Sequence, residues 1–513
     1  MKKRHFFSVI LCGIITATVF SALFPSCGGN TRVDGIMFLR GEEFAKEREF
    51  LGQLLLQPEF SDALGLRLIQ ENQTDKQTAE LFIEFTASWT QAEGIPVSRT
   101  WFIPREDPLE ERTGTSLAYC LNGNETLIPL EELAPPYMGL LVDGLSVADE
   151  NYPLVRFVSI RVRADENGAT GGATVSAGKK KRLEKKIASL ETLLAKTPMT
   201  LAQEPPSIVW VCVAGDLMLD KESSDILLKE GVAGIFGETA KYFEKSDVNL
   251  VNLEGAVSTR GEKVVKSFNF RFDPQTLSPL KNAGINAVLL ANNHTFDYGE
   301  TAFFDTLEHL EKNGITALGA GRDIDTAADP FVFTADRLEI RVFGIASYPR
   351  ERNGWDGTTV SASKGKAGLL HAGRGGAEKL KENLVQKDGV LNALLFHGGT
   401  EWSWKPDAST RSLYTELAKS GADLIVGTHP HTTQGFEWLE GKLVFWSLGN
   451  FVFAGNEGTD GGEEGLLIRL GYAGKTPVYF EPVPVKLTGS RSNIGTAEQL
   501  KHFYALSREL RKR

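Results

Sequence analysis

From Ile208 onward, long hydrophobic runs alternate with stretches of amphipathic character. The runs include IVWVCVA, VNLVNLE, AVLLANN, LNALLFH and DLIVGTHP, while TAFFDTLEHLEKNG and TRSLYTELAKSGA place apolar residues at helical spacing. Runs that are this continuously hydrophobic are typical of strands covered on both faces. The pattern therefore predicts a layered α/β domain over residues 206–490, with helices outside a sheet, followed by a C-terminal helix over 491–513.

The first part of the chain has a weaker pattern. GEEFAKEREFLGQLLL has helical spacing, and LAYCLNG and PLVRFVSIRVRA resemble strands bounded by turn residues. These signals predict a smaller α/β accessory domain over residues 31–165. Its loop VDGLSVADENYPL leaves ligand or partner binding open, although a spacer role is the simpler interpretation.

A linker follows the accessory domain. ENGATGGATVSAG, residues 166–178, has the small, polar and glycine-rich composition of a flexible linker. The next segment, KKKRLEKKIASLETLLAK, has leucine and isoleucine at helical spacing under a basic face. We interpret residues 166–200 as a linker with a solvated basic helix, and contact of this helix with anionic lipid is the alternative.

The N-terminus has the order of a secretory signal. Lys2, Lys3 and Arg4 precede an uncharged apolar run from Phe6 to Phe24, and Cys27 follows it. The end of this segment resembles the lipobox of bacterial lipoproteins, in which Cys27 would carry the lipid. We therefore expect export to the bacterial cell envelope, with residues 1–27 as the signal and attachment to the membrane through lipid. An uncleaved membrane anchor and plain secretion are the alternatives.

Composition excludes several classes of protein. With 513 residues, of which 42% are hydrophobic, the chain is long enough for two or three domains. The net charge of -10 argues against nucleic acid as a partner, because such binding needs a basic face. Beyond the signal only Cys120 and Cys212 remain, which is too few for a disulfide scaffold, and Cys212 lies in an apolar run where we expect it to pack in the core.

Five hydrophobic runs end in side chains that can bind a metal ion. These side chains are Asp216, Asn252, Glu254, Asn292, Asn293, His294, His397, His429 and His431. Because ligands of open α/β sheets bind beyond the carboxyl ends of the strands, we expect these groups to converge. Carboxylates, an amide oxygen and neutral imidazoles suit divalent ions such as Mn, Fe, Zn or Mg, and the absence of thiolate argues against a structural cysteine–zinc site.

Six phrases in this half of the chain resemble the CapA family, named for poly-γ-glutamate capsule biosynthesis. They are GDLML (215–219), NLEGAVS (252–258), NNHTFDYG (292–299), FHGGTEW (396–402), GTHPHTTQGFEW (427–438) and SLGNFVF (447–453). The family's domain is similar to the calcineurin-like metallophosphoesterases. The resemblance implies a sheet sandwich with flanking helices, and it does not extend to the first two hundred residues.

The resemblance also implies roles for individual residues. The expected metal ligands are Asp216, Glu254 at the place of a bridging aspartate, Asn293, His397, His429 and His431. His294 is the expected catalytic histidine, and Asp297 is expected to orient its ring as a carboxylate behind it. The remaining candidates, for binding substrate, are Asn252, Asn292, Glu401, Gln434 and Asn450, of which Asn450 could instead cap a turn.

One position departs from the phosphoesterase pattern. Met218 stands where a histidine is expected two residues after the first aspartate, and Glu254 is one methylene longer than an aspartate. Both changes weaken one of two metal sites. The sequence therefore predicts one or two divalent ions.

Two functions from different classes follow. The first is an exported, membrane-attached metallohydrolase that acts on an envelope phosphoester or on the amide of an anionic γ-glutamyl polymer, since a bound divalent ion activates water and polarises either type of oxygen. The second is a non-catalytic subunit that uses the same fold to bind polymer or other capsule-synthesis subunits. The pair Asn293 and His294 favours the enzyme, and Met218 favours the binding protein.

Overall fold

The computed structural model describes residues 207–351 and 355–511, together with six strands and Lys181 in the preceding part of the chain. The predicted signal with Cys27, the helix expected over residues 41–56, the strand expected at LAYCLNG and all of the basic linker helix except Lys181 lie outside the described residues. No helix among those described is long and apolar enough to cross a membrane.

The chain divides into two compact units. One comprises residues 1–97 and 157–201, and the other comprises residues 98–156 and 202–513. In the first, β1 (Gly35–Phe38) pairs in parallel with β2 (Arg67–Ile69) and β3 (Leu81–Ser88), and β3 pairs antiparallel with β6 (Val155–Ala164), which is the strand predicted at PLVRFVSIRVRA. An antiparallel pair joins β4 (Ile95–Pro104) to β5 (Glu125–Pro129).

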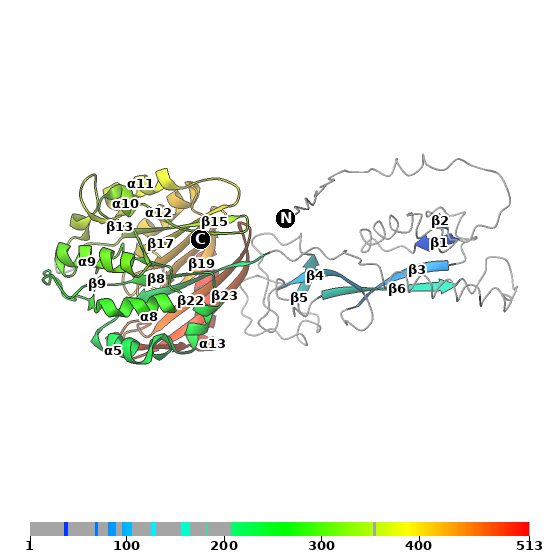
Figure 1. Ribbon diagram of the computed structural model, residues 1–513, viewed down its shortest axis with the longest axis horizontal. Coiled ribbons are helices and arrows are strands. Elements are labelled where there is room, and N and C mark those ends of the chain that lie inside the picture. The colour runs from blue at the N-terminus through cyan, green and yellow to red at the C-terminus, as the bar shows by residue number, and fades with distance from the viewer. Residues whose placement is uncertain are drawn as a thin grey trace, which may run out of the picture. The chain divides into compact units, whose positions relative to one another are not determined.

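Residues 207–511, which we call the C-terminal domain, contain two large sheets (Figure 1). The first has the order β12 (Thr316–Leu318), β11 (Ala287–Leu289), β8 (Val248–Leu253), β7 (Val209–Leu217), β22 (Glu464–Ala473), β23 (Thr476–Thr488) and β24 (Arg491–Ile494), with β21 (Asn450–Val452) also paired to β7. The second has the order β14 (Phe331–Ala335), β15 (Leu338–Ser347), β17 (Val390–Gly398), β18 (Leu424–Thr428), β20 (Lys442–Leu448) and β19 (Thr433–Leu439). Two short pairs join β9 (Ala256–Val257) to β10 (Arg271–Phe272) and β13 (Ala320–Gly321) to β16 (Gly368–Leu369).

Helices cover the outer faces of both sheets. The α-helices of this domain are α5 (Lys221–Glu230), α6 (Val232–Phe236), α7 (Ala240–Glu244), α8 (Leu277–Asn282), α9 (Gly299–Lys312), α10 (Ile324–Ala327), α11 (Gly376–Asn383), α12 (Ala408–Lys419) and α13 (Ala497–Arg511). The helices α8 and α9 pack on the first sheet, and α11 and α12 pack on the second (Figure 1). The predicted layered α/β sandwich is confirmed.

The strand β7 shows why continuous hydrophobic runs fold in this way. Val209, Val211 and Val213 belong to the core between the two sheets, whereas Cys212 and Ala214 face the helices on the other side. Successive side chains of a strand point to opposite faces, so a strand buried on both faces needs an apolar residue at every position. Cys212 is fully buried, as expected, and burial raises the pKa of its thiol far above the usual range.

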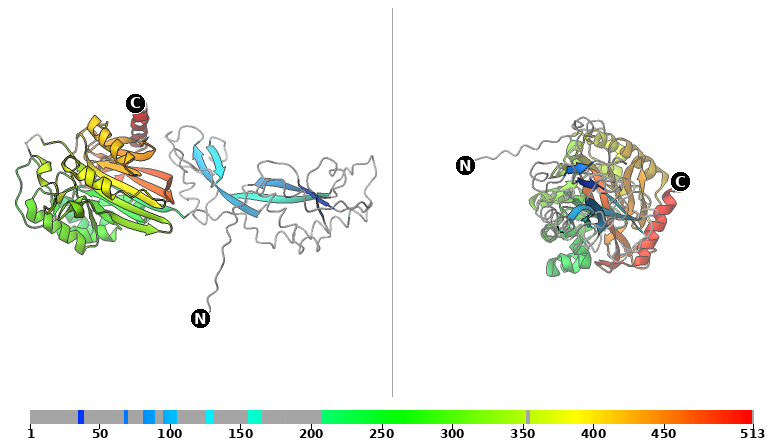
Figure 2. Two further views of the ribbon diagram at one scale, coloured as in Figure 1. Left: turned by 90° about the horizontal axis from the view of Figure 1, so that it is seen from above. Right: turned by 90° about the vertical axis from the view of Figure 1, so that its right-hand side faces the viewer.

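The C-terminal segment differs from the expected helix over residues 491–513. Arg491–Ile494 form β24, which pairs antiparallel with the end of β23 through a turn at Gly489, and the helix α13 begins only at Ala497. This helix lies along the outside of the domain (Figure 2), where the Phe503 ring stacks on that of Phe436 at 5.5 Å. The segment is therefore part of the domain.

Candidate metal centre

The predicted metal ligands lie together at the carboxyl ends of parallel strands. Asp216 is near the end of β7, Glu254 directly follows β8, and His397 is the penultimate residue of β17. Asn293 follows β11 and His429 follows β18. All of these side chains, and that of His431, are buried.

Close backbone contacts explain the glycine before Asp216. A Cβ atom at Gly215 would lie 2.0 Å from the carbonyl oxygen of Gly449, so no other residue fits there without movement of the backbone. The amide of Asp216 donates to the same carbonyl at 3.0 Å. This contact brings β21 against the end of β7 and places Asn450 beside Asp216 in register.

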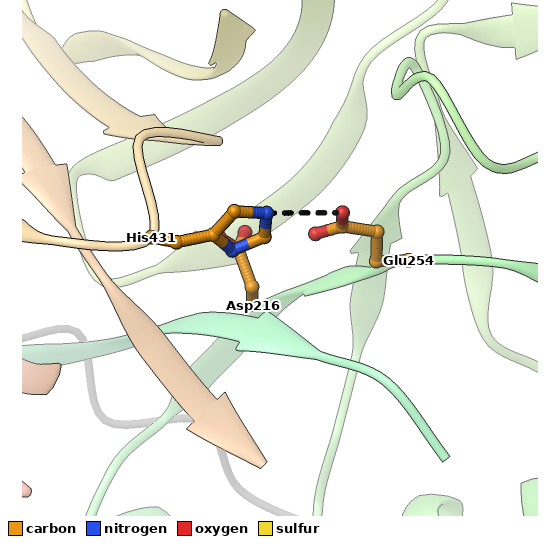
Figure 3. Close-up of side chains that lie close together, drawn as sticks. All are labelled: Asp216, Glu254 and His431. Atoms are coloured by element: carbon orange, nitrogen blue, oxygen red, sulfur yellow. Dashed lines mark ion pairs between the residues drawn. The ribbon is translucent and has the colours of Figure 1, made fainter. Parts of the chain in front are cut away.

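Asp216, Glu254 and His431 form a first set of donors (Figure 3). One ligand atom from each lies within 4.8 Å of the others. His431 Nδ1 is 3.4 Å from Asp216 Oδ2, and His431 Nε2 is 3.9 Å from Glu254 Oε1. The imidazole therefore lies between the two carboxylates.

Asn293, His397 and His429 form a second set. His397 Nε2 is 3.0 Å from Asn293 Oδ1 and 3.1 Å from His429 Nδ1. Two ligands that bind one ion at right angles with bonds of about 2.1 Å are themselves about 3.0 Å apart. The spacing of the second set thus fits a single divalent ion.

Unusual backbone conformations direct the last two histidines. His429 has φ 96° and His431 has φ 58°, and Pro430 stands between them. Such conformations cost about 1–3 kcal/mol each in residues other than glycine, and they cluster at functional sites. In this conformation the His429 amide donates to Asp216 Oδ2 at 3.3 Å, which joins the two donor sets.

Electrostatics favour a cation at this place. Burial and the charge of Asp216 raise the pKa of Glu254 well above its usual range, and burial lowers the pKa of His397 and His429 well below theirs. Burial opposes the charge of His431, but the hydrogen bond to Asp216 and the charge of Glu254 outweigh it and raise its pKa to about 10. The first set thus holds protons in place of a cation, and the second supplies the neutral imidazoles that metals bind.

A buried carboxylate oxygen also supports a bound ion. Within the described residues, Glu254 Oε1 has no hydrogen-bond partner. Buried polar atoms are usually satisfied, so this exception among the donors points to an absent partner. Together with the donor types and their spacing, it indicates that the residues present fit one or two divalent ions.

Comparison with known proteins agrees with this geometry. Residues 210–455 match the family described as Bacterial capsule synthesis protein PGA_cap. Over these residues the chain is similar to the PGA_cap family. The likeness to calcineurin-like phosphoesterases is consistent with that family.

Relatives with curated names match about half of the chain. The capsule biosynthesis protein CapA of Bacillus anthracis is 26% identical over 306 residues, which are 57% of this chain and 71% of that protein. The PGA biosynthesis protein CapA of Bacillus subtilis is 25% identical over 276 residues, which are 53% of this chain and 70% of that protein. A probable polyglutamine synthesis accessory protein of Mycobacterium tuberculosis is 25% identical over 287 residues, or 48% of this chain and 75% of that protein.

Met218 packs in the core of the C-terminal domain. Its side chain is 4% exposed and belongs to the apolar cluster between the first sheet and its helices. Its amide donates to the carbonyl of Val452 at 2.8 Å. The first donor set therefore has two carboxylates and one imidazole, and the thioether is used for packing.

His294 lies beside both donor sets. Its Nδ1 is 2.7 Å from Asp297 Oδ2, and its Nε2 is 3.8 Å from Glu254 Oε1. Phe270 packs on the ring at 4.1 Å, and the amide of Phe270 donates to Asp297 Oδ2 at 2.6 Å. Asp297 is thus placed to orient His294, and burial lowers the pKa of that imidazole.

Lys266 is a site residue that the sequence analysis missed. Its side chain is 1% exposed, and its ammonium donates to the carbonyl of Asn293 at 2.7 Å and to Asp297 Oδ1 at 3.0 Å. It also pairs with Glu351 at 2.9 Å. The signal that could have identified it is a single cation in the otherwise uncharged phrase VVKSFNF, which follows no hydrophobic strand.

Asn252 and Asn292, which we expected to bind substrate, instead support the ligands. Asn252 Nδ2 donates to Asp216 Oδ1 at 2.8 Å and to Glu254 Oε2 at 3.1 Å. Asn292 Nδ2 donates to Asn252 Oδ1 at 3.0 Å, and its Oδ1 accepts from the amide of His294 at 3.1 Å. Both amides are buried, and their hydrogen bonds are made within the protein.

Gln434 and Asn450 also differ from their expected role. Gln434 Nε2 donates to the carbonyl of Ser403 at 2.7 Å, which holds the loop after β17. Asn450 Oδ1 is 2.8 Å from His431 Nδ1, and its Nδ2 donates to the carbonyl of Gly462 at 2.8 Å, so Asn450 positions His431. Among the five substrate-binding candidates, Glu401 is the one that lines the cleft above the donors.

A cleft of about 440 Å³ opens onto the site. Asn293, His294, His429, Lys266 and Tyr348 line it together with the exposed residues Phe268 and Trp402. A small substrate can therefore reach His294 and the second donor set from solvent.

Proposed function

We propose that this protein is a metal-dependent hydrolase in the synthesis of a poly-γ-glutamate capsule or a related envelope polymer. The observation that carries the proposal is the convergence of six donors from separate strand ends beside the His294–Asp297 pair, at the floor of a cleft. The similarity to the PGA_cap family and the names of the relatives support the polymer, and the donor set supports the chemistry.

His294 is the proposed acid. An ionised Asp297 only accepts hydrogen bonds, so the contact of 2.7 Å assigns the ring proton to Nδ1 and leaves Nε2 on the side of Glu254. Protonated at Nε2, the ring would donate to the oxygen that leaves the substrate, a role that general acids fill with gains of about 10²–10⁴ in rate.

The donor sets would hold the divalent ions. Asn293, His397 and His429 would form one site, and Asp216, Glu254 and His431 the other, which Met218 leaves with fewer ligands. A bound ion supplies Lewis acidity to the oxygen that it contacts and lowers the pKa of bound water. The same chemistry serves a phosphoester or a γ-glutamyl amide, and we favour the phosphoester because of the family's phosphoesterase-like ligand pattern.

The second candidate is a non-catalytic subunit that binds polymer or other capsule-synthesis proteins. Met218 in the apolar core is the observation that favours it. It leaves the first metal site with fewer ligands, so catalysis that needs two metal ions is less well supported. An intact His294–Asp297 pair in an open cleft favours the enzyme.

Purified full-length protein separates the two candidates. We expect bound divalent metal by elemental analysis and hydrolysis of bis(p-nitrophenyl) phosphate, with a γ-glutamyl peptide as the second substrate. His294→Ala should remove activity and keep the metal, and His397→Ala should lose both. The matched control is His502→Ala on the exposed face of α13. Metal without turnover of either substrate would support the binding subunit, and activity that survives His294→Ala would refute the mechanism.

We further propose that the protein is exported and held at the membrane through Cys27. The supporting observation is the order of charged, apolar and small residues before this cysteine. Cells fed labelled palmitate should label the protein, and Cys27→Ser should abolish the label. Persistent membrane attachment of Cys27→Ser without label would indicate an uncleaved anchor.

A further inference from the structure

The loop between β9 and β10 exposes large apolar side chains beside the cleft. Within the described residues the exposed large hydrophobic side chains are Leu228, Val265, Phe268, Val332, Val385 and Trp402. Val265 at 93% and Phe268 at 69% are the most exposed of these. Phe268 lines the cleft, and so does Trp402 from the loop after β17.

Hydrogen bonds and ion pairs with Asp297 and Glu351 hold this loop in place. The amide of Val264 donates to the carbonyl of Asp297 at 3.0 Å, and Asn269 Nδ2 donates to the same carbonyl at 3.2 Å. Between them the buried ammonium of Lys266 pairs with Asp297 and Glu351. Val265 and Phe268 are therefore presented to solvent by a loop that Val264, Lys266 and Asn269 hold in place.

Trp402 is also held in place. It has φ 61°, a conformation that costs free energy in residues other than glycine, and its amide donates to the carbonyl of Pro430 at 2.8 Å. The indole packs on His431 at 5.3 Å and is still 38% exposed. One face of the ring covers a donor of the metal centre, and the rest of it borders the cleft.

The cleft combines a polar floor with a rim that carries large apolar side chains. His294, His429 and Asn293 lie at the floor, while Phe268 and Trp402 line the cleft beside Arg350 and Glu401, with Val265 on the same loop as Phe268. Exposed apolar groups that border a polar site favour an amphiphilic ligand, because a ligand that covers them removes apolar area from water. A soluble polyanion could pair with Arg350 but would leave these apolar side chains exposed.

We infer that the substrate is an amphiphilic phosphoester of the membrane, whose phosphoryl group reaches the floor and whose long hydrocarbon chain lies on Phe268, Val265 and Trp402. This inference rests on the proposed function, since it takes the phosphoryl group to be the reacting part. The proposed attachment of the protein to the membrane would hold the cleft close to such lipids.

Binding of non-hydrolysable probes tests the inference without turnover. Calorimetry with the full-length protein compares dodecylphosphonate, below its micelle concentration, with ethylphosphonate, which has the same headgroup. We expect the long-chain probe to bind at least about 30-fold more tightly, and Phe268→Ser to reduce that ratio about tenfold, as expected when one aromatic contact with a chain is lost. Val265→Ser should lower it by a smaller factor.

Matched controls are Val332→Ser on β14 and Leu228→Ser on α5, two exposed apolar side chains outside the cleft, which should leave the ratio unchanged. A ratio near one, a ratio that Phe268→Ser does not alter, or equally tight binding of uncharged dodecyl maltoside would overturn the inference. Because both probes share one headgroup, the ratio reports the chain alone, whereas the His294→Ala assay decides the hydrolase proposal separately.

Discussion

The substitution Glu254→Gln should stabilise the metal-free protein and weaken its response to metal, because it removes a donor of the first set and leaves the second set intact. Glu254 and Asp216 are both fully buried, and the ligand atoms of the first donor set lie within 4.8 Å of one another. At an effective dielectric constant of about 20, two like charges at that distance repel by about 3–4 kcal/mol. Attraction of Glu254 to protonated His431 at 3.9 Å is of similar size, so these two effects nearly cancel.

The cost of burying the charged carboxylate therefore decides whether Glu254→Gln stabilises or destabilises the folded protein. Burial of an unneutralised carboxylate costs several kcal/mol, and burial is the main reason that the pKa of Glu254 lies well above 4.5. The folded protein therefore binds this proton more tightly than the unfolded chain, and wild-type stability falls as pH rises from about 4.5 toward the folded pKa. Glutamine does not titrate, so we expect nearly equal stabilities at pH 5 and an advantage of about 1–3 kcal/mol for Glu254→Gln at pH 8.

Denaturation in EDTA, followed by tryptophan fluorescence, measures this difference. The signal reports mainly the C-terminal domain, which holds Trp210, Trp355, Trp402, Trp404, Trp438 and Trp446. Excess Mn²⁺ should stabilise the wild type, by about 2.7 kcal/mol for each site at a hundredfold excess over its Kd, and should stabilise Glu254→Gln less, through the second donor set alone. Glu244→Gln on the exposed surface of α7 is the control. A Glu254→Gln protein that is less stable than wild type in EDTA at pH 8 would refute the reasoning.

Three further substitutions test the parts of the site. Asn450→Ala should weaken metal binding about 10–100-fold in a chelator competition, because Asn450 positions His431, and unchanged affinity would count against that role. Asp297→Asn should lower turnover about 10²–10⁴-fold with bound metal unchanged by elemental analysis, whereas loss of metal would show that Asp297 supports the ligands instead. Lys266→Met should lower the free energy of unfolding by about 3–5 kcal/mol in urea titrations, because it leaves Asp297 and Glu351 without their buried cation. Adding Glu351→Gln should recover part of that loss, and no recovery would argue against the ion pair as its cause.

The strands of this protein could be predicted because their positions are apolar on both faces. Every residue of β17 is buried, and His397 is the penultimate residue of its run VLNALLFHG, at the carboxyl edge of the sheet. The same rule located Asp216, Glu254, Asn293 and His429, since side chains that follow parallel strands meet at one edge. The hydrophobic pattern alone thus predicted the layered α/β fold and the convergence of the donor side chains at one edge of the sheet.

The roles of the asparagines next to the ligands could not be predicted from the hydrophobic pattern of the strands. Asn252 and Asn292 have the same position after a strand as the ligands, but they lie beneath them and donate to their oxygens, which only the three-dimensional arrangement shows. Lys266 comes from a loop without periodic spacing. The strand β24 escaped prediction because RSNI has a single hydrophobic residue, Ile494, and pairs only at the sheet's edge.

Anomalous X-ray diffraction from crystals of the full-length protein soaked in Mn²⁺ would locate the metal directly. We expect a strong peak among Asn293, His397 and His429, and a second peak of equal or lower occupancy among Asp216, Glu254 and His431. No peak within bonding distance of these six side chains, or manganese bound only elsewhere, would show that these residues do not form a metal centre.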